Sequence, residues 1–136
     1  MKIDSIQYID ELIELNLPRD DFALGGSCPL VIRGLKEKNN DIDIIVTSKL
    51  WSELAKKYPI TIIDINGEKR ELIAIGNIEA ILNPAGIGES EDIVGRADTI
   101  CGYKFVTLDD VITWKEYLNR EKDIVDIKLV KENYQN

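Results

Sequence analysis

The six residues DIDIIV, at positions 41–46, constrain the fold of this chain more than any other stretch. Their isoleucines and valine predict a buried strand, in which alternate side chains point to opposite faces. We therefore expect Asp41 and Asp43 to share one face while Ile42 and Ile44 point into a core. Neighbouring carboxylates repel each other and raise each other's pKa, so the pair needs compensation. A Mg²⁺ or Mn²⁺ ion suits two carboxylates in a chain without histidine; the alternative is a solvent-exposed strand face.

A glycine-rich turn precedes this strand. Residues 22–24 predict a short strand, which Gly25, Gly26 and Ser27 interrupt before a short helix that ends near Gly34. Backbone N–H groups at a helix N-terminus bind anions, glycine lets a phosphate approach closely, and the serine hydroxyl adds a donor. The alternative is a tight turn with Ser27 as a helix cap. An anion site and a divalent-metal site joined by one helix together indicate a site for a nucleoside triphosphate with its metal ions.

The remaining pattern alternates helical and extended segments, and Asn66-Gly67 is a strong hairpin signal. Ser5 and Ser48 are expected to begin helices, as is Thr107 with Asp110 three residues later. Between residues 85 and 98 we expect a loop that holds at most one short helix. We expect helices over 5–15, 27–34, 48–58, 108–119 and 121–133, strands over 22–24, 41–46, 60–65, 69–75 and 78–82, and a last hairpin or edge strand over 99–106.

The fold class that follows is α/β of the α+β kind, a small mixed sheet flanked by helices. The length of 136 residues fits one domain over 1–136. No apolar run approaches the roughly 20 residues of a membrane span, and the N-terminus does not resemble a secretory signal. Two cysteines, Cys28 and Cys101, indicate thiols in a reducing compartment, which predicts a cytoplasmic protein without a membrane partner. A net charge of −8 disfavours bulk attraction to nucleic acid.

The succession of Gly-Gly-Ser, a short helix and Asp-x-Asp on a strand resembles that of the DNA polymerase beta-like nucleotidyltransferase superfamily. Its small, minimal bacterial and archaeal members are the most similar. The resemblance covers about residues 22–130 and includes the C-terminal stretch FVTLDDVITWKEYLNREKDIVDIKLV. It implies a nucleotidyltransferase fold in which Gly26 and Ser27, next to Gly25, hold the triphosphate. Asp41 and Asp43 would then bind two magnesium ions.

A third carboxylate is implied on a neighbouring strand. Glu79 is the first candidate because apolar residues flank it on a short strand. Asp64 is the second and Glu71 the third. The alternative for each is an acid at the surface or at a sheet edge.

Basic side chains are also expected near the acids. Lys115 lies beside an apolar helical stripe that includes Trp114, where a lysine either snorkels to solvent or points into a cleft. The resemblance assigns Lys115 to the triphosphate, and Lys122 is a second candidate. Solvated surface positions are expected for most of the other cations near these sites, which are Arg33, Lys36, Lys38 and Arg120.

Two further features qualify the resemblance. Family members often carry Thr or Ser two residues before the first aspartate, where this chain has Asn39. Asp123 and Asp126, on the last expected helix, are predicted to be surface acids or partners of Lys122 and Lys128. The extra C-terminal substrate domain of larger members is absent, so a second copy or a partner protein is expected to complete the cleft.

The expected function is nucleotidyl transfer from an NTP to an acceptor by a two-metal mechanism. The sequence leaves open which NTP is used and whether the acceptor is a small molecule, a protein side chain or a tRNA end. One alternative is a catalytically inactive nucleotide-binding module, or a toxin–antitoxin-type partner of the same fold. Another is a Ca²⁺ or structural-metal protein that binds no nucleotide.

Overall fold

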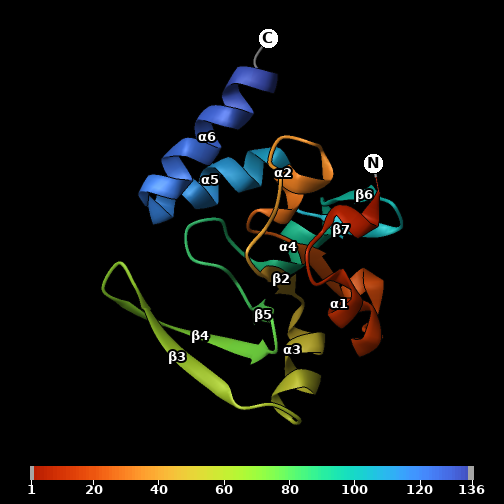
Figure 1. Ribbon diagram of the computed structural model, residues 1–136. Helices are drawn as coiled ribbons and strands as arrows, with labels where there is room; N and C mark the ends of the chain where they lie inside the picture. The colour runs from red at the N-terminus through yellow and green to blue at the C-terminus, as the bar shows by residue number, and fades with distance from the viewer. Residues whose placement is uncertain (1, 135–136) are drawn as a thin grey trace.

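The computed structural model describes residues 2–134, which form a mixed seven-stranded sheet with helices packed against it (Figure 1). Its strand order is β3-β4-β5-β2-β1-β7-β6. At its centre β2 pairs in parallel with β5 and antiparallel with β1, and none of these three strands lies at an edge of the sheet. The strands are β1 (Phe22–Leu24), β2 (Ile42–Val46), β3 (Ile60–Ile65), β4 (Glu68–Ile75), β5 (Ile78–Ile81), β6 (Asp98–Ile100) and β7 (Tyr103–Phe105).

The helices are mostly short, and the longest two follow one another at the C-terminal end of the chain. Two 3₁₀ turns, η1 and η2, accompany them. This mixture confirms the expected α+β class. The helical elements are η1 (Ile3–Ser5), α1 (Ile9–Leu15), η2 (Arg19–Asp21), α2 (Cys28–Ile32), α3 (Ser48–Ala55), α4 (Ser90–Gly95), α5 (Leu108–Leu118) and α6 (Glu121–Tyr134). Within residues 2–134, none of these helices has the length and apolar character that a membrane crossing requires.

The alternation along β2 divides the core into two layers. Ile42 and Ile44 lie in a cluster with buried residues of α1 and α3. Ile45 lies in the other cluster, with Val94 of α4 and Trp114 of α5. Because strand side chains alternate, Asp41 and Asp43 share the face of Ile45, which α4 and α5 cover.

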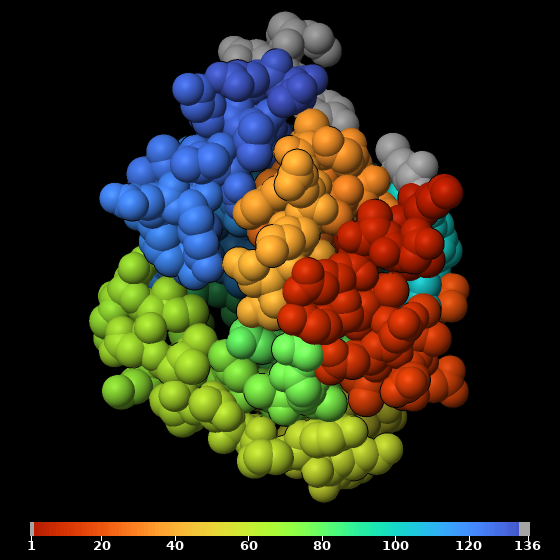
Figure 2. Space-filling model, in the orientation of Figure 1, coloured from red at the N-terminus to blue at the C-terminus, as the bar shows by residue number. Residues whose placement is uncertain are grey.

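The expected hairpin is confirmed between β3 and β4. Asn66 and Gly67 have φ values of 53° and 84°, so both central residues are left-handed, as a two-residue type I′ turn requires. The Asp64 carboxylate accepts a hydrogen bond from the Gly67 N–H, at 2.9 Å. In Figure 2 the surface is hollowed where this hairpin, in yellow-green, approaches the blue helices α5 and α6.

The expected first helix is wrong over its first turns. Ser5 ends a 3₁₀ turn instead of starting an α-helix, and its hydroxyl donates to the Lys2 carbonyl at 2.7 Å. The reason lies in Asn39, whose side-chain amide bonds both the N–H and the carbonyl of Gln7, at 2.9 and 3.0 Å. These are the groups that a continuous helix would use, so α1 starts only after Tyr8, whose φ is 70°.

Helix caps are partly as expected. Thr107 caps α5, where its hydroxyl accepts from the Asp110 N–H at 3.2 Å. Thr47 rather than Ser48 caps α3, and its hydroxyl accepts from the Leu50 N–H. Thr47 has the extended backbone conformation of an N-cap, whereas Ser48 is already helical.

Candidate functional site

Three carboxylates meet where β2 and β5 run side by side. Oxygen atoms of Asp41, Asp43 and Glu79 all lie within 4.8 Å of one another. Asp43 and Glu79 are paired in the parallel β2–β5 register, and Asp41 directly precedes β2. The sheet register therefore brings together the three acids that the sequence singled out.

The two other candidates for the third carboxylate lie elsewhere. Asp64 is exposed on β3 and binds the backbone of its own hairpin turn. Glu71 is exposed on β4, where it pairs with Ile62 of β3. Neither belongs to the cluster of Asp41, Asp43 and Glu79, which we call the acidic triad.

Electrostatics in the acidic triad favour a bound cation. Burial, followed by the negative charges of Asp41 and Glu79, raises the pKa of Asp43 to about 7. Burial and the charge of Asp41 also raise the pKa of Glu79 above its ordinary value. The positive charge of Lys122 opposes both shifts, which places this lysine within electrostatic reach of the triad.

The glycine turn packs directly against the triad. Gly26 has a φ of +60°, and a Cβ built there would lie 2.5 Å from Oδ2 of Asp43. Only glycine fits both this backbone conformation and this close approach. The neighbouring Gly25 donates its N–H to the Asp43 carbonyl at 2.8 Å, and its Cα faces the Trp114 ring. Gly25 therefore holds the Asp43 backbone, and Gly26 lies directly against the Asp43 carboxylate.

Ser27 does not cap α2 with its side chain. Its hydroxyl instead accepts a hydrogen bond from Lys36 Nζ at 3.1 Å. Because α2 has only five residues, its backbone contributes a small dipole. The polar character at this turn therefore comes mainly from Ser27 and Lys36, and the role of Lys36 was not predicted from the sequence.

Lys115 is buried, as its place beside an apolar stripe suggested, but it is engaged. Its Nζ lies 3.0 Å from Asp126 Oδ2 and 3.6 Å from Asp123 Oδ1. It also lines a small cavity of about 40 Å³ together with Gly26 and Asp43. The expectation of a lysine that points into a cleft is thus only partly met, because two carboxylates already balance its charge.

The expected surface position of Asp123 and Asp126 is wrong. Both are almost fully buried and lie in the interface between α5 and α6. Asp123 binds Arg120 through two side-chain contacts of 2.6 and 3.1 Å, and Asp126 binds Lys36 and Lys115. Asp126 pairs with Lys36, 90 residues away in the sequence, which no local pattern encodes, whereas Asp123 pairs with Arg120 only three residues before it.

Asn39 is buried and holds the chain just before the triad. Its amide donates to the Asp41 carbonyl at 2.9 Å, in addition to its two bonds with Gln7. A Thr or Ser at this position could not make all three contacts, because a hydroxyl has a single donor hydrogen. Asn39 therefore fixes the backbone of the first triad residue, a role that the sequence showed only as a departure from a family pattern.

Two other basic residues, Arg33 and Arg120, differ in their relation to the triad. Arg33 binds the Pro29 carbonyl and Asp98 instead of the triad. Arg120, in contrast, has its pKa raised first by Asp123 and then by the charges of Asp43 and Asp41.

A scan against models of protein families finds no match to this chain, and a search of curated proteins finds none either.

Proposed function

We propose that this protein is a metal-dependent nucleotidyltransferase of the nucleotidyltransferase fold, which transfers a nucleoside monophosphate from an NTP to an acceptor hydroxyl. The observation that carries the proposal is the acidic triad on two parallel central strands, with Gly26 packed against one of its carboxylates. Asp43 and Glu79 are half-buried and Asp41 is exposed, and three carboxylates held this close together repel one another unless a cation compensates them. The triad is therefore best explained as a ligand site.

The donor set fits Mg²⁺ or Mn²⁺. Each of the three residues offers a carboxylate oxygen, which is the ligand type that hard divalent cations prefer. Two oxygens on opposite sides of one Mg²⁺ are about 4 Å apart. The oxygens of the triad, within 4.8 Å of one another, thus need only small side-chain rotations to share ions. Burial raises the pKa of the nearby Cys28 thiol, which keeps it protonated and unsuited to act as a ligand.

The step joins the acceptor hydroxyl oxygen to the α-phosphorus and breaks the bond from this phosphorus to the bridging oxygen. Pyrophosphate leaves with the bonding electrons. When bound, the magnesium ions polarise the α-phosphate and neutralise the charge that develops on pyrophosphate. Glu79, at the β4 side of the triad, accepts the proton of the acceptor hydroxyl in this proposal.

Other residues of the chain bind and position the donor. The Ser27 hydroxyl, held by Lys36, donates to a phosphate oxygen, and Gly26 lets the triphosphate approach the backbone. Lys36 supplies positive charge beside Ser27, and Lys122 supplies it within electrostatic reach of both Asp43 and Glu79. The protein thus contributes mainly position and charge, which are the major sources of rate enhancement in phosphoryl-type transfer.

A catalytically inactive nucleotide-binding module is the second candidate. The observation in its favour is that Asp126 binds both Lys115 and Lys36, which reduces the positive charge offered to a triphosphate. Such a module would bind an NTP with Mg²⁺ without releasing pyrophosphate in the presence of any acceptor.

Thermal unfolding with ATP, GTP, CTP or UTP, each with and without Mg²⁺, tests the proposed donor site. A ligand that binds only the folded state raises the free energy of unfolding by RT ln(1 + [L]/Kd). We expect at least one nucleotide to stabilise the protein only with Mg²⁺, and Asp43→Asn to abolish this effect. Asp64→Asn is the matched control, because Asp64 is an exposed acid outside the triad. A folded protein that no nucleotide stabilises would contradict the proposal.

A further inference from the structure

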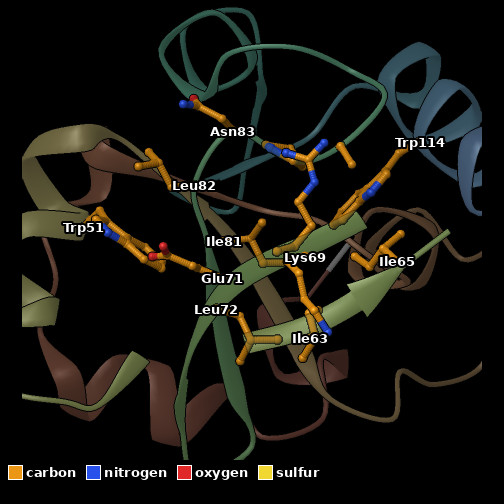
Figure 3. Close-up of a pocket in the computed structure, with 13 residues that line it drawn as sticks. Trp51, Ile63, Ile65, Lys69, Glu71, Leu72, Ile81, Leu82, Asn83 and Trp114 are labelled. Carbon is orange, nitrogen blue, oxygen red and sulfur yellow. The ribbon is translucent and has the colours of Figure 1, made fainter. Parts of the chain in front are cut away.

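A second cavity, of about 330 Å³, opens beside the acidic triad, and no residue of the triad lines it. Its walls come from the β3–β4 hairpin, the end of β5 and Trp114 of α5, with Trp51 of α3 at the opposite side (Figure 3). Asn66 bridges the hairpin to α5 by donating to the Tyr117 carbonyl at 2.9 Å. The volume lies within the range of small-molecule sites.

The register places this cavity next to Glu79. Ile81, which lines it, lies two residues beyond Glu79 on β5, and therefore on the same face about 7 Å away. On the neighbouring strand, Ala74 pairs with Glu79, and Leu72 and Arg70 follow on the same face. A molecule in the cavity can thus extend along β4 toward the triad.

In the sheet order, the strands that line this cavity and the strand that precedes the proposed triphosphate residues lie on opposite sides of the triad, and Trp114 of α5 lies against both the cavity and Gly25. Gly26 and Ser27 follow β1, whereas the cavity lies against β3, β4 and the end of β5. In-line displacement needs the attacking oxygen opposite the leaving pyrophosphate. If pyrophosphate leaves on the β1 side, the acceptor must approach from the β4 side, where the cavity lies.

The lining combines aromatic walls with hydrogen-bond donors. The chain has two tryptophans, Trp51 and Trp114, and both line the cavity. Trp114 is 7% exposed, and its Nε1 has no hydrogen-bond partner among the described residues. Nε of Arg70 is likewise buried and without a partner in residues 2–134. A ligand that supplied acceptor oxygens would satisfy donors that the fold leaves unpaired.

The Arg70 guanidinium favours a ligand with an anionic group, because a hydrogen bond between charged partners is stronger than one between neutral partners. Lys69, Arg70 and Glu71 line the cavity, and Nη2 of Arg70 already binds Oε2 of Glu68 at 2.8 Å, which leaves the buried Nε of Arg70 for a ligand oxygen. Arg70 lies four residues from Ala74 along β4, so its Cα is roughly 13 Å along the strand from the level of Glu79. An anionic group at Arg70 and a hydroxyl at Glu79 would therefore sit at opposite ends of an elongated molecule.

We propose that this cavity binds the acceptor of the transfer reaction, and that the acceptor is an elongated aromatic carboxylate with a hydroxyl at its far end. This inference rests on the proposed function. The ring packs between the tryptophans, the carboxylate binds Arg70, and the hydroxyl oxygen attacks the α-phosphorus while its proton passes to Glu79. The products are the nucleotidylated acceptor and pyrophosphate.

Binding is tested first, without nucleotide or metal, with 4-hydroxycinnamate as the probe. The two indole N–H signals in a ¹H–¹⁵N spectrum report directly on the cavity, since both tryptophans line it. We expect 4-hydroxycinnamate to shift them at lower concentration than the neutral 4-hydroxycinnamyl alcohol. Arg70→Gln should weaken binding of the carboxylate about tenfold, as expected for a lost hydrogen bond to a charged group. The control Lys57→Gln changes an exposed lysine outside the cavity and should leave binding unchanged.

Turnover is tested second, as pyrophosphate release with an NTP and Mg²⁺. We expect release with 4-hydroxycinnamate but not with 4-methoxycinnamate, which binds alike and has no hydroxyl to attack. Binding without release would overturn the acceptor assignment yet leave the cavity as a carboxylate site. Indole shifts caused by an NTP, weakened by Arg70→Gln, would instead assign the cavity to the nucleobase and overturn the inference. If 4-hydroxycinnamate fails to bind while an NTP with Mg²⁺ still stabilises the protein, the inference fails and the proposed function stands.

Discussion

Gly26 adopts a φ of +60° where the chain passes the Asp43 carboxylate, and no side chain fits between them. Gly26→Ala would place a methyl group 2.5 Å from Oδ2 of Asp43, so the carboxylate must move. We expect Mn²⁺ affinity to fall by about tenfold or more, the usual effect of disturbing the support of a metal ligand. Titration of Mn²⁺, followed by electron paramagnetic resonance of the free ion, measures this change.

Gly34→Ala is the control that separates backbone strain from contact with the triad. Gly34 also has a left-handed φ, of +76°, but a Cβ there meets nothing within 4 Å. Both alanine variants should lose roughly 1–2 kcal/mol of unfolding free energy from the left-handed conformation. Only Gly26→Ala should also lose metal affinity. Equal metal affinity in the two variants would show that the Gly26–Asp43 contact does not support the site.

Asp43 predicts an unusual dependence of stability on pH. Its pKa is about 7 in the folded protein, against an ordinary value of 3.8. Without metal, the folded state therefore retains a proton that the unfolded state releases, so the contribution of Asp43 is largest below pH 4. This contribution is lost as pH rises through about 7. Thermal unfolding between pH 5 and 8 should show the decrease, and Asp43→Asn should flatten it.

Metal binding should follow the opposite trend with pH. Since a cation binds the deprotonated carboxylate, affinity for Mn²⁺ should rise as pH increases through about 7. The same Mn²⁺ titration at pH 6 and pH 8 provides the comparison. An affinity independent of pH over this interval would mean that Asp43 is already ionised in the metal-free protein.

The contact between α6 and the rest of the fold depends on a buried charge cluster. Asp126, with a side chain 3% exposed, binds Lys115 at 3.0 Å and Lys36 at 3.1 Å. Asp126→Asn would leave the buried Lys115 with weaker compensation, and we expect a loss of about 3 kcal/mol in unfolding free energy. Urea denaturation measures this loss. Lys115→Met in the Asp126→Asn background should restore part of it, because it removes the charge that was left unpaired.

The control for this cluster lies on the same helix. Glu132 pairs with Lys128 at 3.7 Å, and both side chains are largely exposed. Exposed pairs of this kind contribute less than about 0.5 kcal/mol. Glu132→Gln should therefore leave the urea midpoint almost unchanged. A similar loss in both variants would indicate a general effect of charge on α6 and not a specific buried contact.

Elements defined by local chemistry were predictable from the sequence. The Asn66-Gly67 turn needs only two left-handed residues, and the Thr107 cap needs only a hydroxyl three residues before an N–H. Two-residue alternation predicted that Asp41 and Asp43 share a face, whereas a third carboxylate was implied by the family resemblance, and Glu79 was the first of three candidates for it because apolar residues flank it. The start of α1 was not predictable, because Asn39 takes the backbone groups of Gln7 from 32 residues away. The pairing of Lys115 with α6 was missed for the same reason.

At the scale of the whole molecule, negative charge is spread along the chain and is also concentrated in the acidic triad. The chain carries a net charge of −8, while three of its carboxylates meet on the central strands and cationic residues gather beside them. Self-repulsion of a strongly charged chain destabilises any compact state and is weakened by any salt. A specific divalent site acts in addition to this screening. The two effects are separable because only the second depends on particular residues.

Thermal unfolding in NaCl and in MgCl₂ at equal ionic strength therefore distinguishes screening from binding. Both salts should stabilise the wild-type protein, and MgCl₂ should add about 2.7 kcal/mol when Mg²⁺ is 100 times its Kd. Glu79→Gln should remove most of this increment and retain the response to NaCl, since it changes one ligand and a single charge. Glu71→Gln is the control, because it also removes one negative charge but from an exposed acid of the adjacent β4 outside the triad. The additional stabilisation by MgCl₂ should therefore be as large in Glu71→Gln as in the wild type. If the two variants lose the increment equally, Mg²⁺ acts through general electrostatics and the triad is not the metal site.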